Sequence, residues 1–453
     1  MTRLSLVLPC LCITLWWSCS ETRPPDAPIT TPAPSISTDY QAEVVLITPD
    51  TTRQHWFGYY DKKQIDPSGR YALGMEVDLF MTSPEVTDTL DIILIDLEND
   101  FEKRYIGKST SWGWQQGCML QWIPGSEEEV IWNDHEGEDF VSRVYNIRTG
   151  EERVLPRPIY TLDPTGKYAL TVDFGRLQYF RPGYGYPSKQ ALSVDTPAPT
   201  DDGIWKMDLA TGDSELLISY ADIADFDAPG PDVTGNYHWF NHLLVNPTGE
   251  RFIFLNRSRP IKGRQEMQVF AQENPDWRGA NVKGGSQQYI TRAFTADTDG
   301  SDIYPLNYSG MFSHFIWLRE DTVTAFAMNN EGGRQGFYHF PDRTHESILI
   351  DADQMPYNGH NTFVPGTDYE WVLNDTYPMG EKRMQQLYLY HLPTNTRVDL
   401  GAFHEPAMFR GEYRCDLHPR SDRQGNRVFF DSTHKSGKRQ MYMVDIRPIV
   451  EAK

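Results

Sequence analysis

Three histidines recur at one position of a repeated pattern and form the first candidate site of the chain. His242, His314 and His360 each stand five residues before the proline, or the residue in its place, of a short turn. The equivalent position at the other turns holds Lys62, Met119, Ile159 and Arg414. Converging imidazoles can bind one divalent metal, or act as acid, base and carboxylate binders. The alternative is that they line a channel and hold ordered water.

A second polar set follows the strands that run back to the same end of each unit. It comprises His135 beside Asp134 and Glu136, then Arg176, Tyr179, Tyr184, Tyr186, Arg257, Arg259 and Tyr377. Tyr, His and Arg together suit β-elimination from a uronic acid. A cation or metal neutralises the carboxylate, a base removes the C5 proton, and an acid protonates the leaving oxygen. A glycosidase with paired carboxylates is less favoured.

These residues also have structural interpretations. Tyr184 and Tyr186 could pack a Gly-Pro loop onto the body of the protein. Arg257 and Arg259 could pair with surface carboxylates, and His135 could be a solvated loop histidine.

The elements that must position these side chains repeat seven times as an apolar run, a tight turn and a second apolar run. The turns are Asp66 to Gly69, Ile123 to Gly125, Asp163 to Gly166, Asn246 to Gly249, Leu318 to Asp321, Val364 to Gly366 and His418 to Asp422. A further strand follows each turn: Ile92 to Leu97, Val144 to Ile147, Ile204 to Leu209, Ala293 to Asp299, Gly336 to Pro341, Leu387 to Leu392 and Gln440 to Ile446. This predicts an all-β, seven-bladed propeller. The lone strand Glu43 to Ile47 is expected to close the ring on blade seven.

Composition indicates one large domain with a substantial core. The 453 residues are 39% hydrophobic and 13% aromatic, enough for one core. The formal net charge of -21 argues against nucleic acid or an anionic membrane surface as a partner. An acidic ligand must therefore bind in a local basic pocket.

The N-terminus predicts export. Residues 1–19 combine Arg3 with a short apolar run ending at Cys19, as a secretion signal does. Residues 20–42 are rich in Pro, Thr and Ser, which predicts a tether. We therefore expect a propeller over 43–453, either secreted or held at a bacterial outer membrane through lipid on Cys19. The remaining mature cysteines, Cys118 and Cys415, are expected to be buried free thiols.

Several of these motifs resemble the propeller polysaccharide lyases, a group that includes oligogalacturonate lyases and seven-bladed ulvan lyases. The motifs are His55 to Lys62, the blade starts at His242, His314 and His360, and Arg414 to Arg420. The resemblance to oligogalacturonate lyases implies a channel manganese on His242, His314 and His360, but their glutamine ligand has no clear counterpart here. The metal could therefore be Mn, Ca or Zn.

The resemblance to ulvan lyases implies an anionic polysaccharide substrate made of sulfated rhamnose and uronate. It makes His135 the catalytic histidine, Tyr184 or Tyr186 the tyrosine, and Arg176 or Arg257 the carboxylate partner. Lys62, Tyr179, Arg259, Tyr377 and Arg414 are the expected substrate-binding residues. The competing hypothesis is a non-catalytic propeller lipoprotein that binds glycan or protein.

Overall fold

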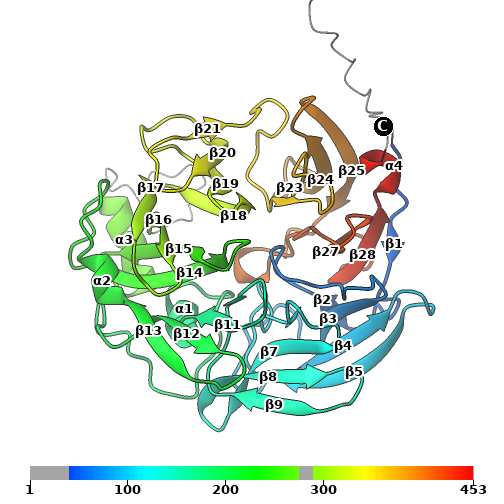
Figure 1. Cartoon of the computed structure of the whole chain (residues 1–453), viewed down its shortest axis with the longest axis horizontal. Helices are drawn as coiled ribbons and strands as arrows, with labels where there is room; N and C mark the ends of the chain where they lie inside the picture. The colour runs from blue at the N-terminus through cyan, green and yellow to red at the C-terminus, as the bar shows by residue number, and fades with distance from the viewer. Residues whose placement is uncertain (1–39, 275–288, 452–453) are drawn as a thin grey trace, which may run out of the picture. The chain divides into compact units, whose positions relative to one another are not determined.

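The computed structural model describes residues 40–274 and 289–451, in which seven four-stranded antiparallel sheets form a ring (Figure 1). Residues 1–39, which include the predicted signal, Cys19 and most of the predicted tether, lie outside the described residues. The predicted seven-bladed propeller is thus confirmed. The expected strand that follows each turn corresponds to the third strand of each sheet.

The first four blades are formed by sixteen strands in chain order. Blade one contains β2 (Gln54–Trp56), β3 (Tyr71–Val77), β4 (Leu90–Asp96) and β5 (Glu102–Ser109). Blade two contains β6 (Gln121–Trp122), β7 (Glu129–Glu136), β8 (Asp139–Asn146) and β9 (Glu152–Leu155). Blade three contains β10 (Thr161–Leu162), β11 (Tyr168–Thr171), β12 (Gly203–Asp208) and β13 (Ser214–Ser219). Blade four contains β14 (Tyr237–Val245), β15 (Arg251–Arg259), β16 (Ile290–Asp297) and β17 (Tyr304–Gly310).

The other three blades complete the ring. Blade five contains β18 (Phe312–Arg319), β19 (Thr322–Ala327), β20 (Gly336–Pro341) and β21 (Ile348–Leu349). Blade six contains β22 (Thr362–Phe363), β23 (Trp371–Asp375), β24 (Met384–His391) and β25 (Thr396–His404). Blade seven contains β26 (Arg420–Ser421), β27 (Arg427–Ser432), β28 (Gln440–Asp445) and β1 (Val45–Leu46). The helical segments are α1 (Phe174–Phe180), α2 (Tyr220–Ala224), α3 (Arg264–Glu273), α4 (Arg447–Val450) and the 3-10 turn Gly411–Tyr413.

The N-terminal strand provides the outer strand of blade seven. β1 lies beside β28 in Figure 1 and pairs with it antiparallel, Val45 opposite Met443 and Leu46 opposite Tyr442. The Tyr40 hydroxyl donates to the Asp445 carbonyl at 2.6 Å. The described end of the predicted tether, residues 40–42, therefore packs against the blade.

The predicted turn of blade seven is wrong by four residues. The hairpin between β26 and β27 turns at Asp422–Gly425, where the Gly425 N–H donates to the Asp422 carbonyl at 3.2 Å. Gly425 has φ +72°, and a Cβ there would lie 2.2 Å from the Pro365 carbonyl oxygen, so glycine is needed. Pro419 instead precedes β26, and Arg423 stands where most other turns have proline.

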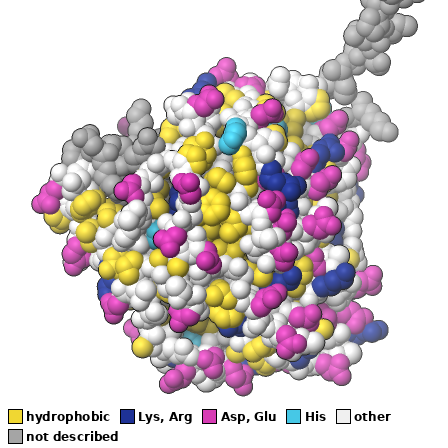
Figure 2. Space-filling view, turned by 60° about the vertical axis from the view of Figure 1, so that its left-hand side comes forward, with side chains coloured by type: hydrophobic (Ala, Val, Ile, Leu, Met, Phe, Trp, Pro, Cys, Tyr) yellow, Lys and Arg dark blue, Asp and Glu magenta, His cyan; other side chains and the backbone are white. Residues whose placement is uncertain are grey.

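Apolar side chains fill the interfaces between neighbouring sheets, which is how each blade buries its faces. Cys118 and Cys415 are buried free thiols, as expected. Acidic side chains are spread over the face shown in Figure 2. Among the described residues, no helix is long and apolar enough to cross a membrane.

Candidate functional site

Four consecutive blades each place one histidine beside the central channel. They are His242 in β14, His314 in β18, His360 before β22 and His418 before β26. The ring centroids of His314 and His360 are 3.9 Å apart, and those of His360 and His418 are 4.4 Å apart. With the turn at Asp422–Gly425, counting back from blade seven reaches His418 rather than Arg414. The spacing Asp-x-x-Gly, rather than the proline, could have revealed this fourth histidine.

The segment of blade one that lies between β2 and β3 and includes Tyr60 to Lys62, here called the strap, crosses the channel next to these rings. The Tyr60 hydroxyl donates to the carbonyl of Phe315 in blade five and accepts from the Phe315 N–H, both at 2.8 Å. The adjacent Asp61 carboxylate lies 3.1 Å from the Lys62 ammonium and 3.3 Å from His242 Nε2. Burial raises the pKa of Asp61, but Lys62 and His242 outweigh it and hold that pKa at about 2.

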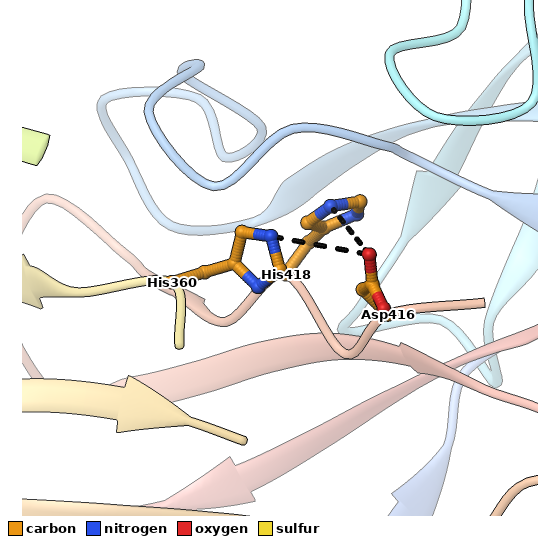
Figure 3. Close-up of side chains that lie close together, drawn as sticks. All are labelled: His360, Asp416 and His418. Carbon is orange, nitrogen blue, oxygen red and sulfur yellow. Dashed lines mark ion pairs between the residues drawn. The ribbon is translucent and has the colours of Figure 1, made fainter. Parts of the chain in front are cut away.

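His360, His418 and Asp416 form the group best arranged for a metal among the described residues, with their ligand atoms within 4.8 Å of one another. Figure 3 shows both imidazoles directed at the Asp416 carboxylate, from which their Nε2 atoms lie 4.0 and 3.9 Å. Asp375 accepts the backbone N–H of His360 and that of His418, and lies 3.0 Å from His360 Nδ1. This contact leaves His360 Nε2 free for a metal. His418 Nε2 is buried without a hydrogen-bond partner.

The structure does not bring the ligand atoms of the predicted metal set, His242, His314 and His360, together as one group. His242 Nε2 faces Asp61, and its ring stacks on Phe315 at 4.0 Å. His314 Nδ1 lies 3.0 Å from Asn358 Oδ1, and its Nε2 lies 3.2 Å from the Tyr377 hydroxyl. Only His360 of the predicted three belongs to the group with Asp416 and His418.

Two of the histidines, His242 and His314, line a cavity of ≈ 470 Å³, here called the channel cavity. Its lining includes six predicted site residues, Tyr184, His242, Arg257, His314, Tyr377 and Arg414, together with the unpredicted Arg181. Asn241 accepts a hydrogen bond from Arg257. Arg257 Nε and Arg181 Nε are buried without partners. The cavity therefore combines unsatisfied cationic donors with several phenols, among them those of Tyr184 and Tyr377.

The phenols of Tyr184 and Tyr377 have opposite electrostatic environments. Burial raises the pKa of Tyr184, but the guanidinium groups of Arg181 and Arg414 outweigh burial and bring it to about 8. The Arg181 guanidinium carbon lies 4.3 Å from the Tyr184 ring centroid, and Arg414 Nη2 lies 3.5 Å from the Tyr184 hydroxyl. Burial raises the pKa of Tyr377 well above its ordinary value.

A second cavity of ≈ 680 Å³, here called the arginine cavity, adjoins the first. Arg181, Tyr184, Tyr289 and Arg414 line both cavities, so the two are contiguous. Arg259, Arg264 and Arg410 line only the second of the two. Arg414 also donates to both oxygens of Asp416, at 2.6 and 2.7 Å, and so links the cavities to the group of His360, Asp416 and His418.

No protein-family model matches the sequence, and no curated protein matches it. Solved structures do match. An oligogalacturonate lyase from Vibrio parahaemolyticus superposes with a TM-score of 0.59 at 14% identity, covering 91% of this chain and 96% of that one. An oligogalacturonate lyase in complex with manganese gives a TM-score of 0.58 at 14% identity, with the same coverage. The ring has the fold of an oligogalacturonate lyase.

Three residues predicted to be catalytic lie outside the two cavities and contact the surrounding scaffold. Arg176 is buried and donates to four backbone carbonyls, those of His238, Ser193, Thr196 and Pro197. Tyr186 stacks on Phe174 at 4.4 Å and accepts from Asn133. His135 packs on Phe140, and its Nδ1 faces Thr110 and Ser111. Arg176, Tyr186 and His135 are absent from the described residues that line the two cavities.

Two predicted substrate-binding residues also lie elsewhere. Tyr179 is 37% exposed and packs edge-on against Phe180. Lys62 is buried between Asp61 and the ring of Tyr160 and faces a separate cavity on the turn side of the ring. Of the predicted alternatives, the structure thus brings Tyr184 rather than Tyr186, and Arg257 rather than Arg176, into the channel cavity. Sequence spacing could not decide these choices.

Proposed function

We propose that this protein is a lyase that cleaves a uronate-containing anionic glycan by β-elimination. One observation carries the proposal: Tyr184 and Tyr377 line one cavity, but the pKa of Tyr184 is lowered to about 8 and that of Tyr377 is raised. Two acidic groups with separated pKa values form an acid and base pair. Buried guanidinium groups beside them suit a carboxylate ligand.

The mechanism assigns a role to each group around the channel cavity. Arg181, Arg257 and Arg414 bind the uronate carboxylate and lower the cost of developing negative charge. The Tyr184 phenolate removes the C5 proton, and the electron pair forms the C4–C5 double bond as the C4–O bond breaks. Tyr377, which keeps its proton, donates it to the departing glycosidic oxygen. The products are a new chain end and an unsaturated uronate.

His360, His418 and Asp416 would hold a divalent metal. The unpartnered His418 Nε2 supports this assignment, as does the His360 ring held by Asp375, because ligating histidines need such orientation. Burial keeps the pKa of His418 well below its ordinary value, and a neutral imidazole is the ligating form. A bound divalent ion would supply positive charge next to the Arg414–Asp416 pair.

Two polymers are the leading substrates. Ulvan is suggested by the resemblance of the sequence motifs to ulvan lyases. Oligogalacturonate is supported by the fold that this chain shares with the two solved oligogalacturonate lyases. We propose that the enzyme acts outside the cytoplasm, as the leader residues 1–19 suggest.

The test is the ultraviolet absorbance of the unsaturated product after incubation with ulvan, polygalacturonate, alginate or glucuronan. Wild type is expected to cleave at least one polymer, and Tyr184→Phe is expected to lower kcat by about 10²–10⁴-fold, the usual contribution of a general base. Tyr179→Phe is the matched control, because its ring lies outside both cavities. His135→Ala is expected to keep activity. No absorbance rise with any polymer, with or without added divalent metal, would favour a non-catalytic glycan-binding propeller.

A further inference from the structure

The arginine cavity contains more positive charge than one carboxylate needs. Its lining includes Arg181, Arg259, Arg264, Arg410 and Arg414, against the single carboxylate of Glu412. The whole chain carries a net charge of -21, and acidic side chains are spread over the face in Figure 2. A concentration of arginines in such a protein is a local reversal of charge, which attracts an anion.

Most of these guanidinium groups have no carboxylate partner among the described residues. Arg414 is the exception, since it pairs with Asp416. Arg259 is 2% exposed; it donates to the Lys262 carbonyl at 2.5 Å, but its Nε is buried and unpartnered. Arg264, the first residue of α3, and Arg410 are exposed and form no ion pair in the part of the chain that the structure describes. Buried unpaired donors are costly unless a ligand satisfies them.

The position of this cavity fixes which part of a ligand would enter it. It shares Tyr184, Arg181 and Arg414 with the channel cavity. A uronate bound for removal of its C5 proton by Tyr184 would therefore place its neighbouring sugar in the arginine cavity.

We propose that the arginine cavity binds a second anionic group, sulfate or carboxylate, on the sugar next to the uronate that is cleaved, and that Arg259, Arg264 and Arg410 recognise it. This inference rests on the proposed function, because it takes Tyr184 as the base. It makes the preferred substrate a glycan with acidic groups on adjacent sugars. The three arginines then determine specificity and take no part in bond breaking.

The test uses Arg264→Gln/Arg410→Gln, a double variant of two exposed side chains whose loss leaves the core intact. Arg319→Gln is the matched control, an arginine at the end of β18 whose side chain is 53% exposed. The substrates are native ulvan, chemically desulfated ulvan and polygalacturonate. Desulfated ulvan carries an anionic group only on alternate sugars, whereas the other two carry one next to the uronate as well.

The double variant is expected to raise KM about tenfold on substrates with adjacent acidic groups, since hydrogen bonds to charged groups are worth this much or more. We expect kcat and the KM for desulfated ulvan to change little. Loss confined to native ulvan identifies sulfate, and loss confined to polygalacturonate identifies carboxylate. A double variant that matches Arg319→Gln on every cleaved substrate overturns the inference.

Direct binding separates this inference from the proposed function. Isothermal titration calorimetry on the full chain with Tyr184→Phe measures affinity for native and desulfated ulvan fragments and for oligogalacturonate without cleavage. Binding that Arg264→Gln/Arg410→Gln weakens, together with a wild type that cleaves no polymer, would support the arginine cavity as an anion site and reject the proposed lyase function. No binding of any doubly anionic fragment would overturn the inference, whatever the activity.

Discussion

Tyr184 and Tyr186 show how strongly a residue's surroundings decide its chemistry. Only Gly185 separates them, yet Tyr184 lies between two guanidinium groups in the channel cavity, while Tyr186 stacks on Phe174 in the core. The pKa of Tyr184 is brought down to about 8, and burial raises that of Tyr186 well above its ordinary value. The sequence could place both in one loop. The sequence could not say which ring enters the channel cavity and which packs in the core, because this depends on how helix α1 (Phe174–Phe180) packs beneath the loop.

The pH dependence of cleavage should report on Tyr184. Because we propose the Tyr184 phenolate as the base, wild-type kcat/KM is expected to rise with pH through about 8, the pKa of Tyr184. Arg181→Gln removes a cation that favours the phenolate, so the rise should move to higher pH. The measurement is a pH–rate profile of both proteins. A rise at the same pH in Arg181→Gln would assign the titration to another group.

At the scale of elements, the turn residues located six of the seven inner hairpins correctly and misplaced the hairpin of blade seven. Six hairpins and seven third strands follow from apolar runs around turn residues. Blade seven fails because Pro419 resembles a turn proline, whereas the hairpin is held by Asp422 and Gly425. This shift of four residues hid His418, and with it the group with His360 and Asp416. Side chains brought together by different blades have no spacing that a single sequence reveals.

The strap of blade one offers a prediction about ring stability. Tyr60→Phe leaves the N–H and carbonyl of Phe315 without their partner in a buried site. We expect the free energy of unfolding to fall by about 1–3 kcal/mol, the cost of an unsatisfied buried group. Denaturant titration measures this change. Tyr71→Phe is the control, since the Tyr71 ring packs under Arg70; equal losses in both variants would mean that the cross-channel bonds contribute nothing.

At the scale of the whole molecule, a closed ring explains how one acidic protein can present a basic cavity. Several blades contribute residues to the channel cavity, so Arg181 from blade three, Arg257 from blade four and Arg414 before blade seven line one space. Their mutual repulsion has to be opposed by the packing of the rigid blades around them. Closure of the ring is therefore a condition for the site as well as for the fold.

The last prediction concerns that closure. A chain that starts at Asp50 lacks β1 and with it the buried Ile47, whose N–H donates to the Met441 carbonyl at 3.0 Å, and Thr48, whose hydroxyl accepts the Met441 N–H at 3.0 Å. Burial of Ile47 stabilises the fold by about 2 kcal/mol and each hydrogen bond by about 1 kcal/mol, so we expect the shortened chain to have a clearly lower Tm and to lose cleavage. It should also aggregate through the edge of β28 that the missing strand exposes. A chain that starts at Tyr40 keeps β1 and should match the full chain in thermal denaturation and activity. Equal Tm values for the two truncated chains would show that blade seven holds the ring closed with three strands.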